Sequence, residues 1–277
     1  MSTLHPSFKI AIDKASSAMR DYSREVRTER WQGLDISKRP EAAMREVIGW
    51  DFRVPMASTS ITHYQSEIEP NLPWADEHFE ERVCGFPMNP GTAWKTWPFA
   101  HSASNFLDSQ GRFEINYMER YWAGADKVFD DTPEPGIKSG LHGIRGRPYG
   151  DLDSVIELFT REPMTRQGYL PVFFPEDTGA GGRVPCSLGY HWIMRNGYFH
   201  VHYPIRSCDF YRHFRDDCYL TVRLTLWLLD RLVEKNPKTW REVKLGYFSM
   251  WIGSLHLFNN DYNKLFPNDQ TPTSSRR

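Results

Sequence analysis

The chain has 277 residues, 40% of them hydrophobic and 14% aromatic, which is enough apolar material for one large domain or two small ones. Its 34 basic and 35 acidic side chains nearly cancel, and this balance argues against a general nucleic-acid-binding or membrane-surface protein. The four cysteines form no CxxC pair, the N-terminus has no signal-peptide core, and the most apolar run is too short to cross a bilayer. We therefore expect a soluble, cytoplasmic protein with no nucleic-acid or membrane partner.

The first half of the chain is predicted to contain two helices and one strand, separated by long loops. Apolar residues at helical spacing predict a helix within 8–30, and 50–56 has the composition of a strand. Five prolines and scattered tryptophans between 63 and 105 indicate a loop-rich insertion. Residues 113–124 have the pattern of a helix, and the glycine- and proline-rich segment 130–150 is expected to be a loop.

The second half is richer in predicted strands. Asn196-Gly197, between two aromatic and β-branched runs, is a strong signal for a hairpin. The order of elements predicts an α+β fold with one main sheet, in a single domain over 1–267 followed by a disordered tail at 268–277. The remaining predicted elements are helices at 152–161 and 217–234, and strands at 169–174, 188–194, 198–203 and 243–258.

Cys186 is the first candidate for chemistry. It ends a glycine-rich loop, and Arg206 follows it by 20 residues (206 − 186) in the sequence Arg-Ser-Cys-Asp. A free thiol has a pKa of roughly 8.5, so a nucleophilic cysteine needs positive charge beside it. The predicted hairpin would bring Arg206 close to the sulfur. A buried structural cysteine is the alternative that composition alone leaves open.

This stretch resembles the thymidylate synthases and the related pyrimidine-nucleotide hydroxymethylases. Their pattern is Pro-Cys, a strand hairpin, Arg-Ser-x-Asp, a specificity residue and a later Gly-x-x-His. The resemblance covers about residues 114–262, and the first 112 residues align poorly. The matching stretches are Pro185-Cys186, 206–209, Asp217 and 253–256, with looser matches at Glu119-x-x-Trp122, at Tyr149-Gly150, and at 162–166, where the family lends an arginine to the neighbouring subunit.

The resemblance implies a twisted mixed sheet packed by helices, with one sheet face forming a homodimer interface. In family chemistry Cys186 attacks C6 of the pyrimidine, and C5 then takes a methylene group from 5,10-methylenetetrahydrofolate. Glu119 would manage proton transfers, and Asp217 would read the base. The other implied contacts are Arg206, Ser207 and the partner chain's Arg166 with the phosphate, His256, Phe258, Tyr149, His191 and Asp209 with the nucleotide, and Asp209, Trp122 and His213 with the folate.

The specificity position indicates the base. Thymidylate synthases carry asparagine there, whose amide accepts from uracil N3–H and donates to O4. A protonated Asp217 matches cytosine instead, whose N3 accepts and whose 4-amino group donates, and leaving such partners unpaired costs about 1–3 kcal/mol each. Capping of the following helix is the alternative role for Asp217. Ser207 favours dCMP, whereas Phe258 in place of a family tyrosine leaves CMP open.

The C-terminal segment indicates the product. Only 21 residues follow His256 (277 − 256), whereas thymidylate synthases run further and close the cofactor site with an apolar C-terminus. An open site admits water to the methylene intermediate. We therefore predict hydroxymethylation by folate and water, with methylation as the alternative.

Two hypotheses of another class remain. His200 and His202 lie on one face of a predicted strand, where they could bind a metal together with Glu176 or His256, as in cupin-type oxygenases. A polar strand face in a dimer interface competes with that interpretation, and we expect no metal. The other hypothesis is a family member that only binds nucleotides, but the joint presence of the motif residues argues against it.

Overall fold

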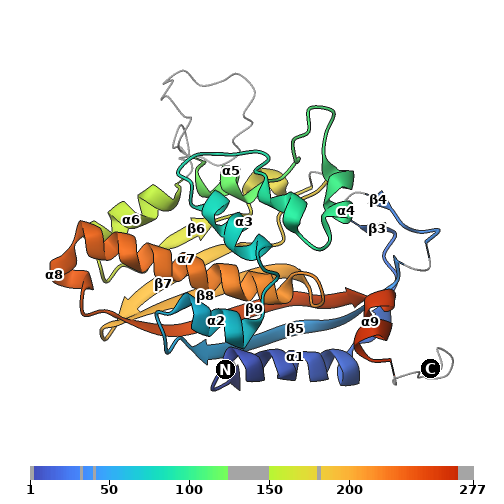
Figure 1. The fold of residues 1–277 in the computed structure, drawn as a ribbon, viewed down its shortest axis with the longest axis horizontal. Coiled ribbons are helices and arrows are strands. Elements are labelled where there is room, and N and C mark those ends of the chain that lie inside the picture. Colours follow the sequence, from blue (N-terminus) through green and yellow to red (C-terminus); the bar gives the residue numbers. More distant parts are fainter. Residues whose placement is uncertain (1–2, 32–33, 40–41, 124–149, 180–181, 268–277) are drawn as a thin grey trace.

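A mixed sheet of seven strands forms the centre of the computed structural model, which describes residues 3–31, 34–39, 42–123, 150–179 and 182–267 (Figure 1). The strand order is β1-β5-β9-β8-β7-β6, and β2 also pairs with β5. The β1–β5 and β8–β9 pairs are parallel, and the other pairs are antiparallel. The strands are β1 Thr3–Leu4, β2 Arg24–Val26, β5 Met44–Pro55, β6 Tyr169–Pro171, β7 Gly189–Arg195, β8 Tyr198–Asp209 and β9 Lys244–Phe258, with β3 Arg30–Trp31 and β4 Leu34–Asp35 in a separate ribbon.

Helices cover one face of this sheet. The long helix α7 (Phe214–Lys235) crosses it, with α1 (Phe8–Tyr22) and α2 (Ile61–Ile68) alongside (Figure 1). None of the helices in the described ranges is both long and apolar enough to span a membrane. The other helices are α3 Trp74–Arg82, α4 Ala100–Ala103, α5 Tyr117–Tyr121, α6 Leu152–Arg161, α8 Pro237–Trp240 and α9 Asn259–Leu265, and short 3-10 turns lie at Ala93–Thr96 (η2), Ser104–Phe106 (η3) and Pro175–Asp177 (η4).

The two faces of the sheet differ because side chains alternate along each strand. In β8, Phe199, Val201 and Tyr203 point into the core under α7, whereas His200 and His202 point to the opposite face. No described helix covers that opposite face, which we call the open face. It carries large exposed apolar side chains on three strands: Ile48 of β5, Trp251 of β9 and Tyr198 of β8.

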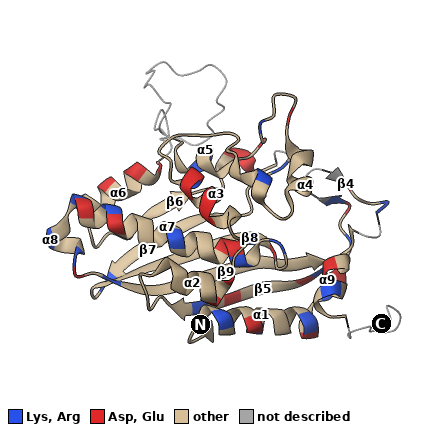
Figure 2. Cartoon of the chain, viewed as in Figure 1, with Lys and Arg blue, Asp and Glu red and all other residues tan. Residues whose placement is uncertain are grey.

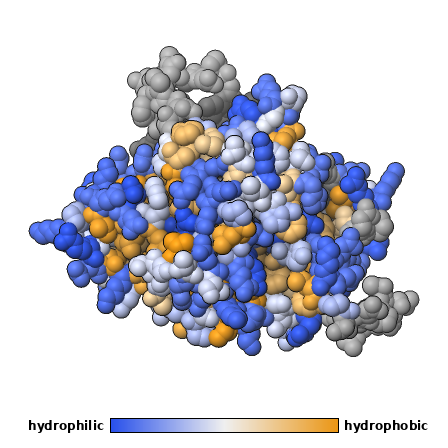
Figure 3. Space-filling view, in the orientation of Figure 1, coloured by the Kyte–Doolittle hydropathy of each residue, from blue (hydrophilic) through white to orange (hydrophobic). Residues whose placement is uncertain are grey.

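The side of the molecule that carries the helices has a mostly polar surface with charges of both signs. Lys and Arg alternate with Asp and Glu along its helices (Figure 2), and hydrophilic residues surround separate apolar spots (Figure 3). This mixture agrees with the near-zero net charge of the sequence.

Several predictions of secondary structure are confirmed. The hairpin turn lies at Asn196-Gly197, whose φ angles of 51° and 74° are those of a type I′ turn. The helix predicted at 152–161 is α6, and Asp151 caps it by accepting from the Ser154 backbone N–H at 3.0 Å. The α+β architecture with one main mixed sheet is also confirmed. The predicted tail at 268–277, and the predicted loop at 130–150 except Gly150, lie outside the described residues.

Other elements differ from expectation. The first helix ends at Tyr22 instead of near 30, because Arg24–Val26 pairs with β5 as an edge strand. The segment 63–105 is not mainly loop: it contains most of α2, all of α3 and several short turns. Its prolines lie between these helices and not inside them, which is where the fixed φ of proline is tolerated. The predicted helix at 113–124 shrinks to the five residues of α5.

Candidate active site

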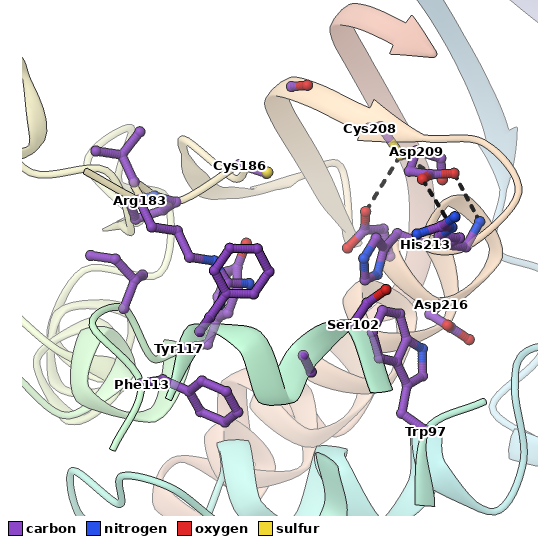
Figure 4. A pocket seen from close by; sticks show the side chains of 18 of the residues that line it. Trp97, Ser102, Phe113, Tyr117, Arg183, Cys186, Cys208, Asp209, His213 and Asp216 are labelled. Carbon is purple, nitrogen blue, oxygen red and sulfur yellow. Dashed lines mark hydrogen bonds and ion pairs between the residues drawn. The ribbon is translucent and has the colours of Figure 1, made fainter. Parts of the chain in front are cut away.

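A cavity of about 560 Å³ opens beside the C-terminal end of β8, next to β9 and the first turn of α7. The helices α3 and α5, the turn η2 and the loop before β7 close its other sides (Figure 4). Seven residues singled out from the sequence line this cavity together: Cys186, Arg206, Ser207, Asp209, His213, Asp217 and His256.

Backbone pairing between the Cys186 loop and β8 positions the thiol. The Arg206 N–H donates to the Cys186 carbonyl at 2.9 Å, and the Arg206 guanidinium donates to the carbonyls of Pro185 and Val184 at 2.8 and 3.0 Å. Burial raises the pKa of the Cys186 thiol, while the charges of Arg206 and Arg183 act in the opposite direction. The resting residue is therefore a thiol whose deprotonation is assisted by two guanidinium groups.

Arg183 is a cavity residue that the sequence analysis did not single out. Its guanidinium lies over the Phe106 ring, 4.6 Å from the centroid, and its side chain extends into the cavity on the side of Cys186 and Tyr117 (Figure 4). It follows a glycine-rich segment interpreted only as a flexible connection. The signal that could have found it is its position three residues before the cysteine.

Asp209, Ser207 and His256 meet where β8 and β9 end side by side. Ser207 Oγ lies 3.4 Å from His256 Nδ1. Asp209 accepts from the backbone N–H groups of Tyr211 and Arg212, each at 3.0 Å. Burial raises the pKa of the Asp209 carboxyl, and the nearby His256 opposes that rise. On the opposite side from Cys186, Asp209 and His213 face the cavity (Figure 4).

Asp217 lies in the first turn of α7 with both carboxyl oxygens engaged by β8. Its Oδ1 accepts from the Tyr203 hydroxyl at 3.4 Å, and its Oδ2 accepts from the Cys208 thiol at 3.5 Å. Burial raises the pKa of Asp217 to about 7, so its neutral acid form is accessible near neutral pH. The adjacent Asp216 has a different task, because its carboxylate accepts from the backbone and the side chain of Asn71 at 2.8 and 2.7 Å.

An aromatic wall closes the side of the cavity formed by α3 and η2. Trp97 stacks on His213 and Trp74 stacks on His78. Burial lowers the pKa of His213 to about 3 and that of His78 to about 4, so both rings are neutral. His78 Nε2 accepts from Arg82, which leaves the ring proton on Nδ1. Three buried nitrogens of this wall have no hydrogen-bond partner in the described structure: the indole nitrogens of Trp74, Trp94 and Trp97.

Five other predicted site residues lie elsewhere in the described structure. Glu119 accepts from Asn89 and from Arg112, outside the cavity wall. Trp122 is buried and donates to the Arg82 carbonyl, and Phe258 is buried beneath the guanidinium of Arg212. His191 and Arg166 contact each other away from the cavity, with His191 Nε2 3.0 Å from the Arg166 carbonyl oxygen. Tyr149 lies outside the described residues.

Besides Glu46 of β5, the glutamate that lines the described cavity is Glu81, on α3. Its side chain is 13% exposed, accepts from the backbone N–H groups of Thr92 and Ala93, and lies 3.6 Å from His78 Nδ1. Local sequence signals do not indicate Glu81, because the proline-rich segment 63–105 has the composition of a loop. The signal that could have found it is the helical spacing of Trp74, His78 and Glu81.

The arrangement of histidines on the open face does not complete a metal site. Within the described ranges, no three side chains of His, Cys, Asp or Glu are grouped so that they could hold a metal ion. His200 Nδ1 instead accepts from the Tyr247 backbone N–H at 3.0 Å. Among the described residues, neither Glu176 nor His256 joins the His200–His202 pair as a third ligand.

No protein-family model matches this sequence, and no curated protein matches it either. Among solved structures, the chain is similar to thermostable thymidylate synthase A from Bacillus subtilis, with a TM-score of 0.58 and 14% sequence identity. The match covers 95% of this chain and 84% of that protein. A likeness at this identity shows the fold alone, so the chain has the thymidylate synthase fold.

Proposed function

We propose that this protein is a one-carbon transferase that hydroxymethylates C5 of a cytosine nucleotide, dCMP or CMP, using 5,10-methylenetetrahydrofolate and water. One observation carries the proposal: Cys186 and Asp217, a thiol and a neutral-capable carboxyl, line the same cavity together with Arg206 and Ser207. These residues match the positions at which the thymidylate synthase pattern has its nucleophile, base-reading group and phosphate ligands.

Cys186 is the proposed nucleophile. Its sulfur adds to C6 of the pyrimidine, which makes C5 nucleophilic, and the sulfur leaves again when the C5 proton has been lost. Arg206 and Arg183 stabilise the thiolate before attack, because both guanidinium groups lower the pKa of the thiol against the effect of burial. The pairing of the Cys186 loop with β8 holds the sulfur in place for this attack.

The phosphate is proposed to bind at the mouth of the cavity. The Arg206 guanidinium uses Nε and one Nη for carbonyl contacts, and its other Nη is available for an anion. Ser207 lies next to it, and Arg30 of β3 lines the same cavity. We propose Arg30 as a further phosphate ligand, supplied by the N-terminal part of the chain.

Glu81 is proposed to take the proton-transfer role that the sequence analysis gave to Glu119. Glu81 lines the cavity and is held by two backbone N–H groups, whereas Glu119 is bound to Asn89 and Arg112 outside it. A general acid or base must reach the group that it protonates, and this placement favours Glu81.

The aromatic wall fits a pterin. A flat heterocycle can stack against the neutral Trp97–His213 pair, which lines the cavity. When bound, 5,10-methylenetetrahydrofolate supplies the one-carbon unit. The wall would hold the pterin ring and cover it on the α3 side, and Cys186 lines the same cavity.

We further propose that the protein is a homodimer joined through the open face. Ile48, Tyr198 and Trp251 expose 70%, 44% and 48% of their surface there, which is unusual for large apolar side chains without a partner. Arg166 is exposed, and the proposal is that it reaches the phosphate site of the partner subunit.

The direct experiment is incubation with dCMP, CMP, dUMP or UMP in the presence of methylenetetrahydrofolate, followed by mass measurement of the nucleotide. We expect a gain of one CH2O unit on a cytosine nucleotide, and no gain without folate. A gain of one CH2 with release of dihydrofolate would establish methylation instead. Tight nucleotide binding without any mass change would identify a protein that only binds nucleotides.

A further inference from the structure

A chain of three hydroxyl groups leads to the Asp217 carboxyl from behind the cavity. The Tyr203 hydroxyl lies 3.4 Å from Asp217 Oδ1, Ser187 Oγ lies 2.5 Å from the Tyr203 hydroxyl, and the Tyr117 hydroxyl lies 3.1 Å from Ser187 Oγ. Tyr203 and Ser187 are fully buried. Ser187 directly follows Cys186, so the chain connects the nucleophile loop to the proposed base-reading residue.

A neutral carboxyl group does not by itself distinguish cytosine from uracil. With the acid proton on one oxygen, it presents a donor to N3 and an acceptor to the 4-amino group of cytosine. With the proton on the other oxygen, it presents an acceptor to uracil N3–H and a donor to O4. An asparagine amide has its donor and acceptor fixed, but an aspartic acid needs a neighbour that fixes its proton.

The hydrogen-bond directions along the chain fix this proton. An unprotonated Oδ1 can only accept, so Tyr203 must donate to it. Tyr203 has one proton, so Ser187 must donate to Tyr203 and Tyr117 must donate to Ser187. In the reverse direction the Tyr117 proton would lose its acceptor, because Ser187 is the only residue of the described structure that pairs with that hydroxyl. The forward direction therefore keeps one more hydrogen bond within the described protein.

We propose that Tyr203 is a positioning residue that sets base specificity: its hydroxyl makes Asp217 Oδ1 the acceptor for the 4-amino group and leaves the acid proton on Oδ2, facing N3. This inference rests on the proposed function, because it concerns the same cavity and the same base. Oδ2 can donate this proton and still accept from the Cys208 thiol, so both oxygens keep their observed partners.

The chain offers a matched control at Tyr190. The Tyr190 and Tyr203 rings stack at 4.8 Å with planes 4° apart, and both are fully buried. The Tyr190 hydroxyl accepts from Tyr121 at 2.8 Å, and not from the chain that ends on Asp217. Removal of the Tyr190 hydroxyl and removal of the Tyr203 hydroxyl should affect packing to a similar extent. Only the removal from Tyr203 takes away the hydrogen bond to Asp217 Oδ1.

The test is isothermal calorimetry of CMP, UMP, dCMP and dUMP binding to the intact protein without folate. We expect the wild-type protein to favour cytosine, Tyr203→Phe to reduce the ratio of cytosine to uracil affinity by about tenfold, and Tyr190→Phe to leave the ratio unchanged. Ser187→Ala removes the donor that orients Tyr203 and is expected to reduce the ratio by about threefold, which provides a second variant if Tyr203→Phe does not fold.

The pH dependence of cytosine-nucleotide affinity distinguishes the positioning role from a merely structural one, because a structural role would leave this dependence unchanged. Cytosine affinity should fall as Asp217 ionises, and because the Tyr203 hydrogen bond favours the ionised form, Tyr203→Phe should shift this fall to higher pH. The titratable and charged groups that face Asp217 are Arg82 of α3, Tyr117 and Tyr121 of α5, Cys186 of the loop, Tyr203 and Cys208 of β8, and Asp216 and Cys218 of α7.

The outcomes distinguish failure of the Tyr203 positioning role from failure of the proposed cytosine specificity. If the wild-type protein favours cytosine and Tyr203→Phe and Ser187→Ala both keep the full ratio, the positioning role is overturned and the proposed function stands. If Tyr190→Phe lowers the ratio as much as Tyr203→Phe, packing and not the hydroxyl is responsible, and the role is again overturned. If the wild-type protein favours uracil or binds neither base, the base assignment itself fails.

Discussion

Trp97 lies flat against His213, with ring centroids 4.7 Å apart and planes 20° apart. The two residues are 116 positions apart in the sequence (213 − 97) and come from η2 and the N-terminal edge of α7. Because burial keeps His213 neutral, the pair presents an uncharged flat surface to the cavity. A segment expected to be loop therefore supplies one wall of the candidate active site.

Trp97→Ala is expected to weaken folate binding by about tenfold, since loss of one stacked ring costs about 1 kcal/mol beyond its buried area. Quenching of tryptophan fluorescence by tetrahydrofolate measures the dissociation constant without turnover. Trp227→Phe is the control, because Trp227 packs on Trp122 and does not line the cavity. Equal folate affinity in wild type and Trp97→Ala would remove the wall from the cofactor site.

Cys186→Ser is expected to abolish turnover and to leave nucleotide affinity within about threefold, because the hydroxyl is a far weaker nucleophile of similar size. Mass spectrometry of the protein after incubation with substrate should detect a nucleotide adduct only when Cys186 is present. Cys84→Ser is the control, since its thiol donates to the Phe86 carbonyl and does not line the cavity. Residual turnover near the wild-type rate in Cys186→Ser would exclude covalent catalysis by this thiol.

Glu81→Gln and Glu119→Gln form a paired test of the proton-transfer role. Loss of a general acid or base lowers kcat by about 10²–10⁴. We expect a loss of this size for Glu81→Gln and a change within about threefold for Glu119→Gln, with circular dichroism used to confirm folding of both. The reverse result would return the role to Glu119, as the sequence pattern indicated.

Asp217→Asn is expected to shift turnover from the cytosine nucleotide toward the uracil nucleotide, because the amide donates to O4 and accepts from N3–H. The measured quantity is the ratio of kcat/KM for dCMP and dUMP, or for CMP and UMP, in the wild-type and variant proteins. A ratio that stays the same in the variant speaks against Asp217 as the base-reading residue.

Asp217 also makes the stability of the protein depend on pH. Its folded pKa of about 7 lies above the ordinary value of 3.8, so the folded state binds more protons than the unfolded state between these values. The Asp217 contribution to the free energy of unfolding is therefore present in full below about pH 4 and is lost as the pH rises to about 7. Urea unfolding at pH 4.5 and pH 8 should show Asp217→Asn gaining stability relative to wild type at the higher pH, by on the order of a few kcal/mol. A difference that does not change with pH would contradict the raised pKa.

The sequence predicted the part of the site that lies on consecutive strands. Cys186 lies just before β7, and Arg206 and Asp209 lie at the end of β8. The turn between these strands is specified by Asn196-Gly197, so local chemistry fixes their relative positions. The same is true of Asp217, which follows β8 by only eight residues (217 − 209).

The sequence did not predict the parts of the cavity wall whose positions depend on tertiary packing. Trp97, Glu81 and Arg183 come from segments rich in proline or glycine, where local signals indicated loops. Their positions depend on the packing of α3 against α5 and α7, which periodicity within a single segment does not reveal. The proton-transfer role of Glu119 stays a prediction from a two-residue motif, and the structure places its side chain beside Asn89 and Arg112 outside the cavity lining.

The type I′ turn between β7 and β8 also determines on which face of the sheet each β8 side chain lies. Deletion of Gly197, or insertion of one residue after it, would shift the register of β8 against β7 by one position, in opposite directions. Every side chain from Tyr198 to Asp209 would then exchange sides, so imidazoles would enter the apolar interior and the tyrosine behind the carboxyl would face outward. The smallest length change in the hairpin loop should thus be more damaging than most point substitutions inside the cavity.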